Sequence, residues 1–259
     1  MPMNQRLLRP RQSGYTASDA DARAYLSAVR AADGSAVEPG VAKAIDDFVK
    51  GCKSDGVWDA IKASCILCGA RTLAGINVPL KGTTPTFNAF TASEYNRKTG
   101  LVGNGSTMWI DSGRNNNADP QDSKHIAVWR STAATNDAGM MGSNGTTAGH
   151  THIYTGFGSF IFRNNAATSG NIPLSDMTGA GFLGTSRNSS SSFTHIVGTS
   201  TVTATVTSQT PANATIRVFE TGGRTNARIA FYSIGEGLTL SLLGSRVSAL
   251  MSAIGAAIP

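Results

Sequence analysis

Residues 226–259, NARIAFYSIGEGLTLSLLGSRVSALMSAIGAAIP, contain the two elements around which we expect the fold to be organised. The stretch 227–234 is short and rich in β-branched and aromatic residues, which predicts a buried strand. Two glycines then predict a turn. A helix should follow, because five apolar residues recur three or four positions apart and form one stripe: Leu240, Leu243, Val247, Leu250 and Ile254.

The apolar stripe must be covered by another surface. In one interpretation the helix packs on its own domain, and in the other it forms an intermolecular seam like a short coiled coil. Both interpretations assign the same packing residues, which are Leu243, Val247, Leu250 and Ile254. Several polar residues lie outside the stripe, namely Ser241, Ser245, Arg246 and Ser248.

The composition favours short strands joined by many turns. Only 15% of the 259 residues are charged, against roughly 25% in a typical soluble domain, and 29 are glycine. The length allows one large domain or two small ones. The low charge also suits a surface that is buried in an assembly.

The net charge of +6 is spread along the chain, without a basic helix or a run of Lys and Arg. We therefore expect no direct binding to nucleic acid, which normally needs a clustered basic stripe. No secretory signal and no run of membrane-spanning length is evident, so we expect no membrane insertion.

We divide the chain into three parts: an extended basic arm at 1–15, a small helical anchoring segment at 16–75, and a β-domain with its C-terminal helix at 76–259. The arm carries a local cluster of Arg6, Arg9 and Arg11. It is either a frayed terminus or a docking tail for an acidic partner surface.

The helical segment is predicted to contain three short helices. The first runs from Ser18 to Ala32 and ends at Gly34, and the second begins near Pro39. The third follows Asp55 and carries Trp58, Ile61, Cys65 and Cys68 on one side. The segment 71–82 is then predicted to be extended.

From Thr83 onward the pattern becomes β. Short candidate strands are separated by clusters of Gly, Asn, Ser and Pro, which indicates a sandwich or barrel and not a parallel α/β sheet. The candidate strands are Thr107–Ile110, His125–Arg130, His152–Tyr154, Ser159–Phe162, Phe193–Val197, Thr201–Thr207 and Thr215–Glu220.

Three groups of residues could carry metal or redox chemistry. Cys65 and Cys68 form the only CxxC motif, and we expect buried thiols on the apolar side of the third helix. His150 and His152 could bind a metal, but a solvent-facing polar pair is the simpler interpretation. The oxygen-rich loop around Asn115–Asp122 could supply calcium ligands, although its spacing matches no EF-hand. We therefore expect no cofactor and no metal.

The sequence contains no recognisable catalytic motif. The β-region has few acids, without the alternating acidic pattern of a glycosidase, and no nucleophile elbow or phosphate loop is present. Sugar binding would need an exposed aromatic side chain beside amides and hydroxyls. The candidate glycan-binding residues are Trp109, Trp129, Tyr154 and Asn116, although any one of the aromatic side chains could instead lie in the core.

Three separated blocks, at 51–82 (GCKSDGVWDAIKASCILCGARTLAGINVPLKG), 95–129 (YNRKTGLVGNGSTMWIDSGRNNNADPQDSKHIAVW) and 228–258, resemble a group of tailed-bacteriophage virion proteins. The resemblance covers about residues 20–258. It implies a concanavalin A-like (laminin-G-like) jelly roll, mainly β, behind a small helical N-terminal segment. The second cysteine of CILC departs from that group.

The resemblance implies a structural or host-attachment role in the virion and no reaction. We expect a homo-oligomer, a trimer, that docks on other virion proteins through its N-terminal part and displays the jelly roll. The virion position, in the head, tail or fibre, stays open. The alternatives are a lectin-like adhesin for host surface glycan and a polysaccharide depolymerase.

Overall fold

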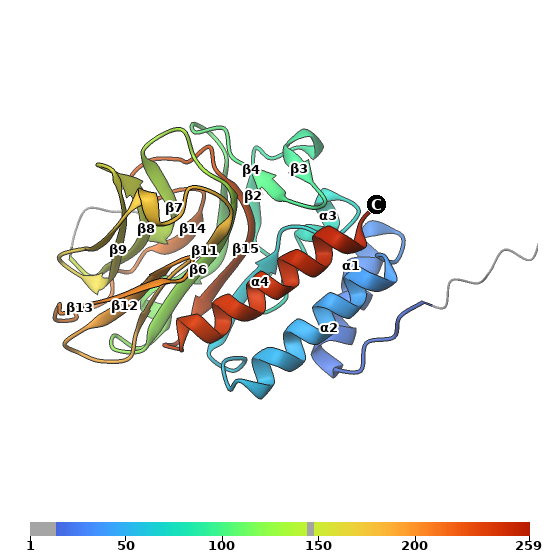
Figure 1. The fold of residues 1–259 in the computed structure, drawn as a ribbon, viewed down its shortest axis with the longest axis horizontal. Coiled ribbons are helices and arrows are strands. Elements are labelled where there is room, and N and C mark those ends of the chain that lie inside the picture. The colour runs from blue at the N-terminus through green and yellow to red at the C-terminus, as the bar shows by residue number, and fades with distance from the viewer. Residues whose placement is uncertain (1–13, 144–147) are drawn as a thin grey trace, which may run out of the picture.

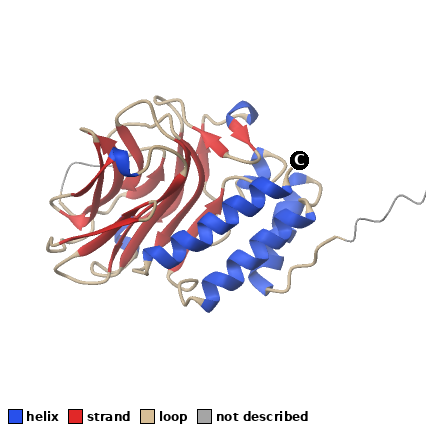
Figure 2. Ribbon diagram, in the orientation of Figure 1, coloured by secondary structure: helices blue, strands red, loops and turns tan. Residues whose placement is uncertain are grey.

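The computed structural model describes residues 14–143 and 148–259. Two antiparallel β-sheets pack face to face, and a layer of helices covers the outer face of one of them (Figure 1 and Figure 2). The prediction of a mainly β sandwich with N-terminal helices and a C-terminal helix is confirmed. The predicted arm residues Arg6, Arg9 and Arg11 lie outside the described residues.

The larger sheet, sheet A, has eight strands. Seven follow the order β13-β12-β11-β6-β15-β4-β3, and β1 pairs with β15 beside this path. Its strands are β1 (Ile61–Ile66), β3 (Tyr95–Asn96), β4 (Gly100–Val102), β6 (Lys124–Thr132), β11 (Gly181–Arg187), β12 (Phe193–Val197), β13 (Ser200–Ala204) and β15 (Arg228–Gly235). The predicted C-terminal strand is therefore β15, near the middle of the sheet.

The smaller sheet, sheet B, has the order β10-β9-β8-β7-β14-β5-β2. Its strands are β2 (Thr86–Asn88), β5 (Trp109–Asn115), β7 (Ala138–Ser143), β8 (His150–Gly156), β9 (Ser159–Ala166), β10 (Gly170–Pro173) and β14 (Thr215–Val218). Short 3₁₀ turns interrupt the connections at Ala92–Glu94, Asn116–Ala118 and Leu174–Asp176.

The helices are α1 (Ala20–Asp33), α2 (Pro39–Ser54), α3 (Leu73–Ile76) and α4 (Leu240–Ala257). The side chain of Asp19 caps α1, and Gly34 ends it in the left-handed conformation with φ of 69°. The predicted first and second helices thus form close to their expected positions. The segment predicted to be extended contains α3, a single turn capped by Thr72.

The apolar stripe of α4 packs inside this one chain. Leu243, Val247 and Ile254 are fully buried, and Leu250 is nearly so. In Figure 1, α4 (red) runs alongside α2 (blue), and both cover sheet A. A side chain at Gly40 would come within 2.7 Å of Ala257, so a glycine allows the close approach of the two helices.

The predicted third helix is wrong. Residues 61–66 form β1, which pairs antiparallel with β15, so this part of the predicted helical segment belongs to sheet A. Five of the six residues of β1 are buried. A strand covered on both faces is almost continuously apolar, and such a run contains helical spacing by chance.

Asp46 holds the entry to α1 against α2. This fully buried carboxylate accepts hydrogen bonds from the Tyr15 hydroxyl (2.6 Å) and from the backbone amides of Ser18 (3.1 Å) and Asp19 (2.8 Å). Burial acts to raise the pKa of Asp46, but these hydrogen bonds outweigh burial and keep the pKa well below its ordinary value. The residues before α1 are thereby fixed to the helical layer.

The helix α4 is also long and apolar enough to cross a membrane, with 18 residues and a mean hydropathy of 1.4. This test uses length and composition alone, and the core helix of a soluble domain passes it too. In this structure the apolar stripe of α4 contacts α2 and sheet A, and its remaining face carries serines.

Candidate functional site

A groove with ligand-binding chemistry lies between α4 and the outer face of sheet A. Two aromatic residues, Trp129 on β6 and Phe182 on β11, are register partners and form its floor. Side chains alternate along β6, so Trp129 faces the helices while its neighbour Arg130 points between the sheets and stacks on Phe160 at 5.1 Å. Phe182 is almost fully buried, whereas Trp129 is partly exposed.

The walls of the groove come from two elements that are far apart in the sequence. One wall is the polar face of α4, with the exposed residues Ser241, Ser245, Ser248, Ala249 and Ser252. The other wall is formed by the end of β12 and the turn into β13, including Gly198, Thr199 and Thr201. The groove has a volume of about 680 Å³, within the usual range for small-ligand sites.

Gly244 sets how closely α4 approaches the floor. A Cβ atom at this position would lie 2.9 Å from the Phe182 ring, so a side chain there would push the helix outward. The helix is instead seated directly on Phe182, which leaves the ring of Trp129 beside the serine face of α4. The width of the groove therefore depends on a residue without a side chain.

The groove offers hydroxyls and aromatic surface without charge. Its lining contains no Asp, Glu, Lys, Arg or His among the described residues. An aromatic ring flanked by hydroxyls suits a neutral polyhydroxyl ligand, because the ring contacts the apolar face of a sugar while the hydroxyls exchange hydrogen bonds. The lining supplies no group that could act as a general acid or base near pH 7.

Trp109 and Tyr154, two of the predicted glycan-binding residues, lie elsewhere. Both are partly exposed on sheet B, on strands β5 and β8. The ring of Trp109 is covered by the Arg217 guanidinium at 4.2 Å, and Arg217 also pairs with Glu220. The structure therefore does not bring Trp109, Trp129 and Tyr154 into one site.

Asn116 is fully buried, which does not fit its predicted contact with glycan. Its amide nitrogen donates to the carbonyl of Gly149 (2.9 Å) and to the side-chain oxygen of Asn165 (3.1 Å). A local count of polar residues suggested an exposed loop. Asn116 turns inward while its neighbours Asn115 and Asn117 are exposed. Distant groups accept from its amide nitrogen, whereas its buried Oδ1 atom has no partner among the described residues.

In the buried part of the same loop, two cationic side chains already pair with the carboxylate that calcium would use. Asp119 is buried, and Arg114 and Lys124 both donate to its carboxylate, with the Lys124 nitrogen 3.1 Å away. Burial alone would raise the pKa of Asp119, but the two cations hold it below its ordinary value. Burial lowers the pKa of Lys124 to about 8. A calcium ion would have to displace these cations.

The histidines are less exposed than the sequence suggested. His150 is almost fully buried, with its Nδ1 atom 3.0 Å from the Ser143 hydroxyl, so the expected solvent-facing pair is wrong for this residue. His125 and His195 are fully buried. Within residues 14–143 and 148–259, no cluster of three or more His, Cys, Asp or Glu is arranged to hold a metal ion.

The buried thiols predicted at the CxxC motif are confirmed, although Cys65 lies on β1 and not on a helix. The Tyr232 hydroxyl lies 3.4 Å from the Cys65 sulfur, and the Cys68 sulfur lies 3.7 Å from that of Met251. Burial raises the pKa of both thiols to about 12. They are therefore protonated and unreactive at neutral pH.

Sequence reasoning found Trp129 but missed the rest of the groove. The signal for one wall was present, because the serines at 241, 245, 248 and 252 recur three or four residues apart, opposite the apolar stripe. Phe182 and the turn into β13 gave no local signal. Their place in the groove depends on the pairing of β11 with β6 and β12.

Comparison with known proteins identifies the fold only. No protein-family model matches the sequence, and no curated protein matches it. Among solved structures, a mutant of Trypanosoma rangeli sialidase with trans-sialidase activity aligns with a TM-score of 0.51 and 8% identity, over 82% of this chain and 39% of its own. A mutant of HCR/D aligns with a TM-score of 0.50 and 8% identity, over 74% and 52%.

A third similar structure is domain 4 of AbnA, a GH43 extracellular arabinanase from Geobacillus stearothermophilus, in complex with arabinotriose. It has 14% identity and a TM-score of 0.40, over 64% of this chain and 82% of that domain. The chain spans about half or less of the HCR/D and sialidase structures. The sialidase and HCR/D alignments support the predicted jelly-roll sandwich and show the fold alone.

Proposed function

We propose that this protein is a non-enzymatic virion surface protein whose jelly roll binds a neutral glycan in the groove beside α4. The observation that carries the binding proposal is the groove lining, in which Trp129 lies beside the serine face of α4 without any charged side chain. An uncharged, hydroxyl-rich groove favours a neutral sugar over an acidic one. It also supports binding without catalysis.

The virion role rests on the three sequence blocks that resemble tailed-phage virion proteins. The helical layer provides a second, compatible observation, because α1 and α2 form one side of the molecule away from sheet B (Figure 1). In this proposal the N-terminal part docks on other virion proteins, and the subunits form a homo-oligomer, a trimer. The sandwich is displayed outward.

The binding proposal is tested with an array of neutral oligosaccharides, followed by calorimetric titration of the strongest ligand. The expected result is binding that falls about fivefold or more in Trp129→Ala, because an aromatic contact contributes on the order of 1 kcal/mol or more. Trp109→Ala is the matched control, since Trp109 is another partly exposed tryptophan on the opposite sheet. Its affinity should stay within about twofold of the unmodified protein.

A second variant blocks the groove without touching the core. Ser248 is exposed on the groove wall, so Ser248→Trp should abolish binding while leaving the melting temperature unchanged. Failure of every neutral glycan to bind, or equal affinities for Trp129→Ala and the unmodified protein, would refute the proposed site. Release of reducing ends from any bound polysaccharide would refute the non-enzymatic assignment.

The virion role is tested separately by fractionation of virus particles and by light scattering of the purified protein. The expected result is co-sedimentation with particles and a molar mass of three chains. A strict monomer that is absent from particles would contradict the virion role but would leave the groove proposal intact.

A further inference from the structure

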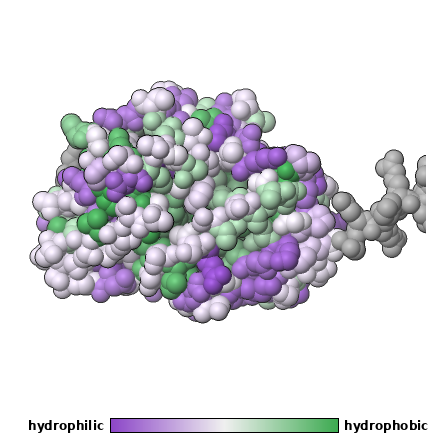
Figure 3. Space-filling view, viewed as in Figure 1, coloured by the Kyte–Doolittle hydropathy of each residue, from purple (hydrophilic) through white to green (hydrophobic). Residues whose placement is uncertain are grey.

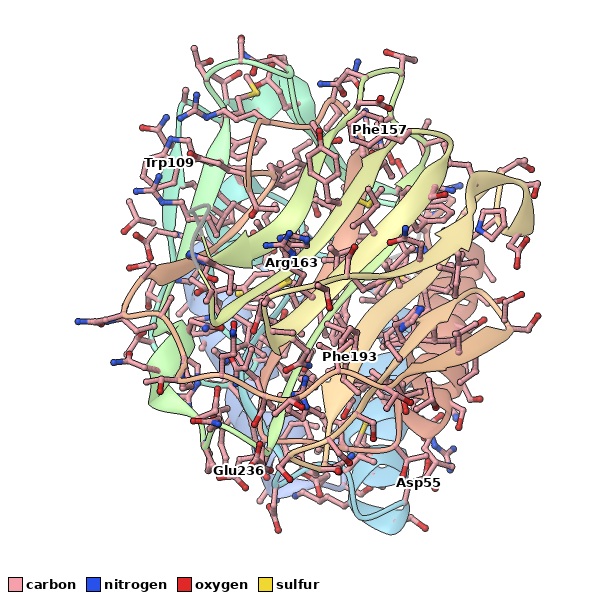
Figure 4. All side chains as sticks on the ribbon, turned by 90° about the vertical axis from the view of Figure 1, so that its left-hand side faces the viewer. Asp55, Trp109, Phe157, Arg163, Phe193 and Glu236 are labelled. Atoms are coloured by element: carbon pink, nitrogen blue, oxygen red, sulfur yellow. The ribbon has the colours of Figure 1, made fainter. Side chains whose placement is uncertain are left out.

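The face of sheet B that points away from sheet A carries a row of residues set side by side by the strand register. Arg217 on β14 pairs with Gly142 on β7, Gly142 pairs with His152 on β8, and His152 pairs with Arg163 on β9. We call these four residues the Arg163 row. Figure 4 views this face directly and shows Arg163 near its centre.

Arg163 differs from the other arginines of this face. Arg217 and Arg224 both form ion pairs with Glu220. Among the described residues, by contrast, no acid pairs with Arg163; its buried Nε atom has no acceptor, as is also true of the Nε atom of Arg224. Arg163 is partly exposed, and a buried guanidinium nitrogen without an acceptor is costly, so an oxyanion that accepts a hydrogen bond from Arg163 would offset this cost.

His152 adds a second polar atom without a partner. Its Nε2 atom is buried and has no hydrogen-bond partner among the described residues. His152 and Arg163 are directly opposite across β8 and β9, a placement that brings Cβ atoms to about 5 Å. Burial, together with the charge of Arg163, lowers the pKa of His152 to about 3, so the imidazole is neutral and can donate one hydrogen bond.

Gly142 makes room for this arrangement. A Cβ atom at Gly142 would lie 2.6 Å from the Cβ atom of His152, so any side chain there would displace the imidazole. On the far side of His152, the partly exposed ring of Tyr154 lies 6.5 Å away, tilted by 50°. The row therefore combines a guanidinium, an imidazole and an adjacent aromatic surface.

These groups match an oxyanion carried on a sugar. The planar guanidinium of arginine binds a carboxylate or sulfate through two parallel hydrogen bonds, and such charge-assisted bonds are the stronger kind. The aromatic ring beside them can contact the sugar itself. The net charge of +6 attracts acidic polymers to the molecule.

We infer that Arg163 and His152, at one end of this row, form a second glycan site, which binds the carboxylate or sulfate group of an acidic polysaccharide; Arg217, at the other end and paired with Glu220, lies outside this site. This site lies on the opposite sheet from the groove beside α4. It takes a ligand of different charge, so either site can be shown or refuted without the other.

The test measures binding of the full chain to three defined probes by calorimetric titration. They are an oligogalacturonate, its methyl ester, in which a methyl group on each carboxyl removes the charge, and a sulfated oligosaccharide of similar length. The expected result is that at least one acidic probe binds and that the ester binds about tenfold or more weakly. Arg163→Gln should lower the affinity for the acidic probe by about tenfold or more.

Arg217→Gln is the matched control, because it removes an equal charge from the same row where that charge is already paired with Glu220. Its affinity should stay within about threefold of the unmodified protein, and Trp129→Ala should have no effect. Binding of the sulfated probe alone, with the same loss in Arg163→Gln, would support the site and select sulfate over carboxylate.

Three results would overturn the inference: no binding of either acidic probe, equal binding of the ester, or equal losses in Arg163→Gln and Arg217→Gln. The last result would show attraction to the general positive charge of the protein. Unchanged melting temperatures of both variants exclude unfolding as the cause of any loss.

Discussion

Two adjacent leucines on α4 allow a sharp test of how this helix is used. Leu243 is fully buried against α2 and sheet A, whereas Leu242 is 39% exposed. Replacement by Ala removes the same three carbon atoms at both positions and changes helix propensity equally. Any difference between the two variants therefore reports burial alone.

The expected magnitudes differ several-fold. Leu243→Ala removes a fully buried side chain and leaves a cavity, which costs about 3–5 kcal/mol of unfolding free energy. Leu242→Ala should change the free energy by no more than about 0.5 kcal/mol. For a chain of 259 residues, the larger loss corresponds to a fall in melting temperature on the order of 10 °C.

Urea unfolding followed by tryptophan fluorescence measures both variants, because Trp129 lies beside α4. The Leu243→Ala midpoint should shift while the slope of free energy against urea stays constant. Equal losses for the two variants, or a loss below about 1 kcal/mol for Leu243→Ala, would refute the buried packing of the stripe. A loss that depends on protein concentration would instead favour the intermolecular seam.

Other predictions concern the N-terminal anchor, a strained turn and acid stability. Asp46→Ala should lower the free energy of unfolding in urea by about 2–4 kcal/mol, because it leaves buried donors without an acceptor. The control Asp47→Ala, at the exposed neighbour, should lower it by no more than about 0.5 kcal/mol. Similar losses in the two variants would contradict the anchoring role. Phe157 is 92% exposed at the β8–β9 turn and has a φ of 53°. Asn tolerates this left-handed conformation, so Phe157→Asn should raise the free energy of unfolding by about 0.5–1 kcal/mol. A lower melting temperature would show that the Phe157 ring stabilises the folded state. Burial lowers the pKa of His125 and of His195 to about 4. The unfolded chain therefore binds protons at these histidines at a higher pH than the folded chain does. Their stabilisation is complete above pH 6.5 and is lost as the pH falls from 6.5 to 4. The loss should reach about 2 kcal/mol for each of these two histidines at pH 5. Burial lowers the pKa of His150 and His152 as well, so His195→Leu should remove about a quarter to a third of the histidine part of the pH dependence; an unchanged profile in that variant would contradict the assignment.

Local sequence patterns were sufficient for the two C-terminal elements. The strand at 228–235 is buried on both faces, and its β-branched and aromatic run identified it without alternation. The helix at 240–257 formed as predicted because its spaced apolar residues report one buried face. Gly34 ended the first helix because its left-handed conformation is local and needs no distant partner. The many short strands followed from the turn residues between them.

Tertiary structure alone decided the features that depend on distant partners. Residues 61–66 became a strand because β15, far along the chain, offered them a pairing edge, and burial on both faces removed the alternation that would have identified a strand. Asn116 turned inward, where a distant backbone carbonyl and a distant side-chain oxygen accept from its amide nitrogen. The groove and the Arg163 row likewise form only when the strand register brings their residues together. The periodicity of a sequence indicates whether a side chain is buried, but not which residue it faces.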